Sequence, residues 1–287
     1  MRFISLLLSL VVMSGAASAD LSELWTVEGF KMPESVVYDT KRDRFYVSNV
    51  NMGVMEQDNN GSIGYIAADG SHSVVDWVSG LSSPKGIDLY NNYLYVADVK
   101  ELVVIDVDKE KIVARYLAPE SGILNGLTVS ENGDVFVSDW IGNKIFKLQD
   151  HGLALWLDST DLESPNGLWV SDQYLYVSAW GKNPAKDFST ETSGMLKRIS
   201  LKTKVINNVN QKGHRWMNLD GIHKKSTSSW YVSDFKTGEL LQINNNGKLE
   251  ETYKLEPSAA DFYYIDDKKM VIVPYLMSNK VVAYKVN

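Results

Sequence analysis

Short runs of alternating apolar and polar residues, joined in pairs by turns, make up most of this chain. The segment SPNGLWVSDQYLYVSAW, residues 164–180, holds two such runs joined at Ser171-Asp172-Gln173. Alternation with a period of two predicts β-strands that each bury one face. The pair occurs six times, and each copy starts with one polar or charged residue, here called the anchor. The six anchors are Glu34, Lys85, Asn125, Asn166, Asp220 and Asp261.

The spacing of the copies predicts the fold. Consecutive anchors lie 51, 40, 41, 54 and 41 residues apart, and the second run of each pair ends 13 to 15 residues after its anchor. Further alternating runs follow, such as ELVVIDV and then KIVARYL from Lys111. A period of roughly 40–50 residues with four short strands is typical of a propeller blade. We therefore predict an all-β, six-bladed β-propeller.

The sixth copy ends at Asn287 with only three runs, so its outer strand must come from elsewhere. The simplest source is Leu24-Trp25-Thr26-Val27, near the mature N-terminus. Pairing there would close the ring and remove the exposed edge between the first and last blades. A frayed N-terminal arm is the alternative.

The first residues predict a signal peptide. Arg2 is followed by an apolar run over residues 3–13, and Ala17-Ser18-Ala19 fits a small-residue cleavage site. The apolar run is too short to span a membrane. We expect a signal peptide over residues 1–19, a single propeller domain over residues 20–287, and a secreted or periplasmic protein.

Composition limits the kinds of partner and of chemistry that the protein can have. A net charge of −7 over 287 residues argues against nucleic acid, and the absence of cysteine excludes disulfides and thiol catalysis. The sequence contains no nucleophile elbow, phosphate loop or dinucleotide fingerprint. We expect a monomer that has no membrane span and acts on a small molecule.

The anchors, at equivalent positions, should point into one central channel. Glu34, Asn125, Asn166 and Asp220 would present two carboxylates and two amide carbonyls, a ligand set that suits a hard cation. Calcium fits better than zinc because no anchor is His or Cys. The alternative is that polar residues before glycine only cap turns.

Other residues should surround the same channel. The aromatic residues that follow the second strands predict a partly apolar rim at the end of the channel where the anchors lie. These are Trp140, Trp180, Phe235 and Tyr275. Two long loops, residues 50–61 and 181–193, belong to this end as lids or as plain insertions. The residues that end four second strands, Asn49, Asp98, Asp139 and Asp234, are expected to bond neighbouring backbone.

The runs PESVVYD, LNGLTV, PNGLWV and LDGIHK resemble the six-bladed propellers of the senescence-marker-protein (regucalcin)/gluconolactonase family. They are similar also to diisopropylfluorophosphatase and the paraoxonases. The resemblance implies that Glu34, Asn125, Asn166 and Asp220 bind a divalent cation, commonly Ca²⁺. It further implies hydrolysis of lactones or phosphoesters at that ion, with Asp220 as general base or nucleophile.

The sequence departs from that family pattern at two anchors. Lys85 could neutralise Glu34 or Asp261, stabilise an oxyanion, bind an acidic substrate group, or compete with the cation. Asp261 stands where some relatives use a histidine. Arg215, in the loop before the fifth anchor, is a further residue that could contact substrate.

Two functions follow. The first is a Ca²⁺-dependent hydrolase of lactones or related esters, of gluconolactonase type, in which Asp220 and Lys85 act on the substrate. The second is a propeller without catalysis whose mouth binds a small molecule or a protein, with a structural metal or none. The fold alone does not choose between them.

Overall fold

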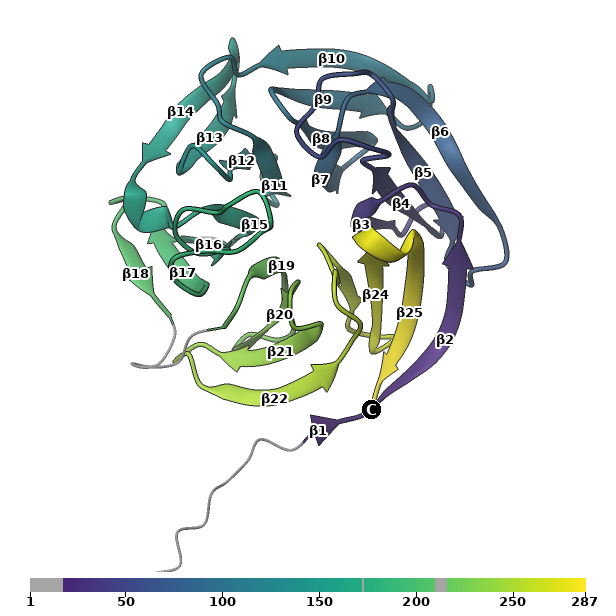
Figure 1. Ribbon diagram of the computed structural model, residues 1–287. Coiled ribbons are helices and arrows are strands. Elements are labelled where there is room, and N and C mark those ends of the chain that lie inside the picture. Colours follow the sequence, from purple (N-terminus) through teal and green to yellow (C-terminus); the bar gives the residue numbers. More distant parts are fainter. Residues whose placement is uncertain (1–17, 172, 210–215) are drawn as a thin grey trace, which may run out of the picture.

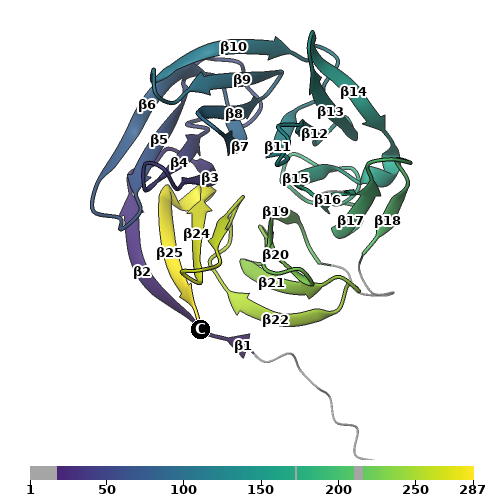
Figure 2. The same ribbon diagram turned by 180° about the vertical axis from the view of Figure 1, so that it is seen from behind.

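The computed structural model describes residues 18–171, 173–209 and 216–287, and it confirms the all-β, six-bladed β-propeller. Six antiparallel sheets are arranged as a ring, and the inner strand of each faces the centre (Figures 1 and 2). The described residues contain no α-helix; two short 3₁₀ helices cover Thr160–Leu162 and Leu276–Ser278. None of the helices in this part of the chain is long and apolar enough to cross a membrane.

Each blade has four antiparallel strands, ordered from the centre of the ring outward. Blade 1 is β3 (Pro33–Asp39), β4 (Arg44–Asn49), β5 (Gly61–Ala67) and β6 (Ser73–Leu81). Blade 2 is β7 (Pro84–Tyr90), β8 (Tyr93–Asp98), β9 (Glu101–Asp106) and β10 (Lys111–Leu117). Blade 3 is β11 (Leu124–Val129), β12 (Val135–Asp139), β13 (Lys144–Gln149) and β14 (Gly152–Asp158).

The second half of the ring follows the same order. Blade 4 is β15 (Pro165–Val170), β16 (Tyr174–Ala179), β17 (Met195–Ser200) and β18 (Ile206–Asn208). Blade 5 is β19 (Leu219–Lys224), β20 (Ser229–Asp234), β21 (Glu239–Asn244) and β22 (Leu249–Lys254). Blade 6 is β23 (Tyr263–Ile265), β24 (Met270–Tyr275), β25 (Lys280–Val286) and β2 (Leu21–Glu28).

The N-terminal strand closes the ring, as predicted. β2 pairs antiparallel with β25, from Leu21 opposite Val286 to Glu28 opposite Lys280. Figure 1 shows the purple N-terminal strand beside the yellow C-terminal blade. The frayed-arm alternative is therefore wrong for this segment. A two-residue strand, β1 (Ser18–Ala19), runs parallel to β22 and adds a fifth strand to the sheet of blade 5.

The core lies between the blades. Each of six apolar clusters draws side chains from two adjacent blades; for example, Tyr46 and Ile63 of blade 1 pack with Leu94 and Val103 of blade 2. Both faces of a sheet are thus buried against neighbouring sheets. This arrangement fixes how the inner strands approach one another at the centre.

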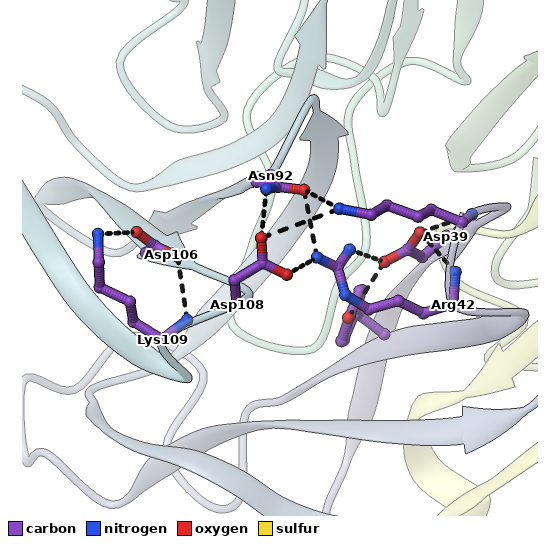
Figure 3. A network of polar contacts seen from close by, with 8 residues as sticks. Asp39, Arg42, Asn92, Asp106, Asp108 and Lys109 are labelled. Atoms are coloured by element: carbon purple, nitrogen blue, oxygen red, sulfur yellow. Dashed lines mark hydrogen bonds and ion pairs between the residues drawn. The ribbon is translucent and has the colours of Figure 1, made fainter.

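An ion-pair network joins blades 1 and 2 at the turns that lie away from the anchors (Figure 3). Arg42, in the β3–β4 turn, donates from Nη1 to Asp39 Oδ2 at 2.7 Å and from Nη2 to Asn92 Oδ1 at 3.2 Å. It also pairs with Asp108. The Arg42 side chain is only 14% exposed, whereas Lys109, which pairs with Asp106 at 2.6 Å, is 62% exposed.

We expect Arg42→Ala to lower the free energy of unfolding by about 1–2 kcal/mol, because it removes a largely buried guanidinium that bonds Asp39 of blade 1 and Asn92 and Asp108 of blade 2. Lys109→Ala, in the same network, removes an exposed ammonium, and Asp106 keeps the backbone amide of residue 109 as a donor, so we expect a loss below about 0.5 kcal/mol. Urea unfolding of the two variants measures the difference. Equal losses of stability in the two variants would show that the exposure of the basic side chain does not determine how much its ion pair contributes.

Candidate functional site

Five of the six anchors line one cavity near the end of the channel where the inner strands begin, here called the mouth. Each is the second residue of an inner strand, and together they form the floor of the cavity. The five are Glu34, Lys85, Asn125, Asn166 and Asp220.

A β-bulge places each of these anchors. In blades 1 to 5 the pairing of the inner strand with its neighbour shifts by one residue just after the strand's first residue. In blade 4, for example, Pro165 lies opposite Ala179, but Leu168 lies opposite Val177. A bulge adds an unpaired residue and redirects side chains. The anchor lies within the bulge, so its side chain is available to the channel.

In blades 2 to 5 glycine follows the anchor because adjacent inner strands nearly touch at the centre. A Cβ on Gly126 would lie 2.0 Å from the carbonyl oxygen of Asn166, and one on Gly167 would lie 2.4 Å from that of Asp220. The anchor–glycine pair therefore reflects blade packing as well as the bulge. The alternative that the polar residues before glycine only cap turns is wrong for Asn125 and Asn166, since they lie within strands β11 and β15.

A serine in the second strand fixes the bulge. Ser138 Oγ accepts a hydrogen bond from Gly126 N at 2.8 Å and donates one to Asn166 O in the next blade at 2.7 Å. Ser233 does the same between Gly221 N and Ala260 O. These serines were not among the predicted residues, although the repeated Val-Ser before the end of the second strand was a signal for them.

The carboxylates that end the second strands hold the backbone leading to the anchors, as predicted. Asp98 accepts from Ser82 N and Ser83 N, at 2.8 and 2.6 Å. Asp139 accepts from Gly122 N and Ile123 N, both at 2.8 Å. Asp234 accepts from Met217 N at 2.7 Å. In blade 1, Asn49 Oδ1 accepts from Lys31 N at 3.1 Å.

Apolar side chains form the walls above the anchors. The rings of Trp140 and Trp180 are 5.6 Å apart, and Phe235 lies 5.3 Å from Trp180. Phe188, from the loop over residues 181–193, packs on the same cluster at 6.2 Å from Trp180. The loop over residues 50–61 provides Val54, so both long loops contribute to the cavity. The predicted residues Trp140, Trp180 and Phe235 are thus brought together, whereas Phe188 was missed.

Three predicted site residues lie elsewhere. Tyr275 is still within β24, and its hydroxyl bonds that of Tyr284 at 2.9 Å inside the core between blades 5 and 6, so Leu276 takes its expected place in the wall. Asp261 does not line this cavity; it accepts a 2.8 Å hydrogen bond from Ser35 Oγ farther along the channel. Arg215 lies outside the described residues.

Burial dominates the electrostatics of the floor. It raises the pKa of Glu34 to about 8, with the charge of Asp261 adding to the effect and that of Lys85 opposing it. Burial, then the charges of Glu34 and Asp261, raises the pKa of Asp220 well above its ordinary value. Burial lowers the pKa of Lys85 to about 8. The single positive charge of Lys85 offsets only part of the repulsion among these crowded carboxylates.

The buried oxygens of the floor fit a cation. Glu34 Oε2, Asn125 Oδ1 and Asp220 Oδ1 are buried and have no hydrogen-bond partner among the described residues. Unpaired buried acceptors are costly, and three that line one cavity suit a hard divalent ion. Lys85 Nζ donates to Ser83 O and Ser83 Oγ, both at 2.9 Å, so its ammonium has partners in the residue just before β7. These residues therefore fit the predicted Ca²⁺ ligand set.

The cavity is small. Its volume is about 50 Å³, which accommodates an ion and a few water molecules rather than a whole substrate. A larger ligand must displace the aromatic wall, and Phe188 belongs to a loop, so it is the wall residue most easily moved.

No family model matches the sequence, and no curated protein matches it. Solved structures do match. Virginiamycin B lyase from Staphylococcus aureus aligns with a TM-score of 0.64 at 12% identity, over 92% of this chain and 99% of that one. A streptogramin B lyase aligns with a TM-score of 0.61 at 12% identity, over 93% of this chain and 97% of that one. An auxiliary nutrient binding protein from Bacteroides thetaiotaomicron aligns with a TM-score of 0.64 at 12% identity, over 89% of this chain and 69% of that one. At these identities the likeness shows the six-bladed β-propeller fold alone.

Proposed function

We propose that this protein is a Ca²⁺-dependent hydrolase of lactones or related esters that carry an apolar group. The observation that carries the proposal is the set of three unpartnered buried oxygens, on Glu34, Asn125 and Asp220, beneath an apolar wall. Such a site combines a position for a cation with apolar walls that suit the substituent of an uncharged ester. The resemblance to the gluconolactonase family supports the same assignment.

Glu34, Asn125, Asn166 and Asp220 would hold the ion. When bound, Ca²⁺ would polarise the carbonyl oxygen of the substrate. Because Ca²⁺ activates water weakly, Asp220 would take the proton of the attacking water or attack the carbonyl carbon itself. Lys85 has two of its three protons bonded to Ser83, which leaves one for a substrate oxygen.

The aromatic wall has a second role in this proposal. The indole nitrogens of Trp140 and Trp180 are buried without a partner among the described residues. Each is a donor that a substrate oxygen could satisfy. The apolar wall favours an alkyl or aryl substituent over the hydroxyl groups of a sugar lactone, since each buried hydroxyl needs a partner there.

The alternative function is binding without catalysis, by a secreted or periplasmic propeller with a structural ion. The small volume of the cavity favours it. So do two exposed methionines, Met52 in the loop over residues 50–61 and Met277 in the 3₁₀ helix Leu276–Ser278, which are 70% and 65% exposed. Flexible methionines suit adaptable binding surfaces.

Assays with alkyl- and aryl-substituted lactones, a sugar lactone and a phosphotriester, each with and without a chelator, test the proposal. We expect hydrolysis of the apolar lactones, a loss of more than about tenfold on chelation, and recovery with Ca²⁺. If chelation lowers Tm and no ester class is hydrolysed, binding without catalysis is the better account.

A further inference from the structure

A second cavity opens on the face of the propeller opposite the mouth. Its volume is about 440 Å³, and it lies at the far ends of the inner strands β7, β11, β15 and β23. Asp88, Thr128, Trp169 and Tyr263 line it. The same four residues also line an inner cavity of about 40 Å³ that reaches His223. The two spaces share these walls, so they form one funnel, here called the lower funnel, that narrows toward His223.

His223 places an unused hydrogen-bond acceptor at the narrow end. Its Nδ1 lies 3.0 Å from the carbonyl oxygen of Lys224, so Nδ1 carries the proton and donates it. Nε2 is then an acceptor, and it is buried with no partner among the residues the structure describes. Burial lowers the pKa of His223 to about 4, which keeps the ring neutral. A ligand that satisfies Nε2 must bring an N–H or O–H donor.

Asp88 adds a carboxylate to the wall of the funnel. Its Oδ1 accepts from Leu89 N at 2.8 Å and its Oδ2 from Val129 N at 2.7 Å. Each oxygen retains a further lone pair. Burial raises the pKa of Asp88 to about 6, so the group is ionised at neutral pH. Asp88 therefore places in the funnel a negative charge whose geometry is set by two backbone amides, and a second carboxyl group, that of Asp261, lines the same inner cavity.

Aromatic faces flank these acceptors. The ring of Trp169 lies 4.4 Å from that of His223, and the ring of Tyr263 lies 4.7 Å from it. Glu131 adds a further acid to the lining, and the acid Asp134 is paired with Lys147 at 2.9 Å. Lys224 is the basic residue of the lining, and it is exposed. Acceptors, negative charge and π faces together suit a cation.

We propose that the lower funnel binds a slender organic cation with a primary ammonium group. The inner cavity accommodates the ammonium and one or two methylene groups beside Asp88 and His223, and the rest of an alkyl chain lies in the outer cavity against Trp169 and Tyr263. This site is independent of the mouth and needs neither the metal nor hydrolysis.

Titration of the ¹⁵N-labelled protein with n-pentylammonium chloride, followed by amide resonances, tests the proposal. We expect saturable shifts at Leu89 and Val129, whose amides bond Asp88, and none at Trp140 or Trp180 in the wall of the mouth. Uncharged 1-pentanol should bind at least about tenfold more weakly. The measurement uses the native protein, so it does not depend on whether a variant folds.

Two variants sharpen the test. Asp88→Asn should weaken pentylammonium binding by about tenfold or more, whereas Asp134→Asn, at a carboxylate already paired with Lys147, should change it by less than about twofold. Three results would overturn the proposal: no saturable shift up to about 20 mM amine, equal binding of pentanol, or the same shifts with CaCl₂ in place of the amine. The last would make the funnel a metal site.

Discussion

Replacing Asp220 with asparagine is expected to reduce kcat for ester or lactone hydrolysis by about 10²–10⁴-fold, the usual contribution of a general base. Asparagine retains an oxygen of the kind that Asn125 and Asn166 already present, so it can still contact a cation. It cannot accept a proton or act as a nucleophile. The calcium affinity should therefore fall much less than kcat. Measuring kcat at saturating Ca²⁺ separates the two effects.

Asp261→Asn is the matched control for that prediction. Asp261 is also a buried carboxylate of the channel, and burial raises its pKa to about 7, but it bonds Ser35 and does not line the mouth cavity. We expect a loss of less than about tenfold in kcat for this variant. If Asp220→Asn retains the full rate, or if both variants lose activity equally, Asp220 is not the base.

The repeat pattern was sufficient to predict the fold because each blade has the same alternation of apolar and polar residues. It also predicted the closing strand. The sixth copy has only three strands, so one edge of its sheet was left without a partner. The pattern did not reveal the bulges. A bulge is defined by how two strands pair, and the sequence of one strand does not show that one of its residues is unpaired. Asn166 could therefore be assigned to the channel, but the reason it points there could not.

Side chains beyond the anchors were harder to predict. Tyr275 follows the same local pattern as Trp180, yet β24 continues through it and turns its ring into the core between two blades. Phe188 lies in a loop without periodicity, so nothing in the sequence indicates that it packs on Trp140 and Trp180. Asp261 has the right register, but its carboxylate bonds Ser35 of the neighbouring blade and does not line the mouth cavity. The positions of these side chains depend on contacts between blades.

In the absence of divalent cations, the stability of the protein is expected to fall as the pH rises from about 5 to about 8. Glu34 has an ordinary pKa of 4.5 and a pKa of about 8 in the folded state, so between these values the folded state holds a proton that the unfolded state has released. Stability decreases with pH wherever the folded state binds more protons. Asp220 and Asp261 act in the same direction.

Lys85 reverses the trend at higher pH. Its ordinary pKa of 10.5 is lowered to about 8, so from about 8 to 10.5 the unfolded state holds the extra proton and stability rises again. The metal-free protein should thus have a minimum of stability near pH 8, lower than at pH 5 by on the order of a few kcal/mol and several degrees in Tm. Saturating Ca²⁺ binds the ionised carboxylates and should remove most of this minimum.

Thermal unfolding between pH 5 and 10, with chelator and with Ca²⁺, measures both curves. Glu34→Gln removes one of these titrations and should make the fall of the metal-free curve below pH 8 less steep, whereas Lys85→Met should abolish the rise above it and strengthen calcium binding, because a positive charge leaves the floor. A metal-free protein whose stability rises from pH 5 to 8 would mean that the floor carboxylates do not hold protons in the folded state. Two curves that coincide would mean that these anchors hold no cation. The floor would then be a structural network of blade contacts, and hydrolysis at the mouth would have no basis.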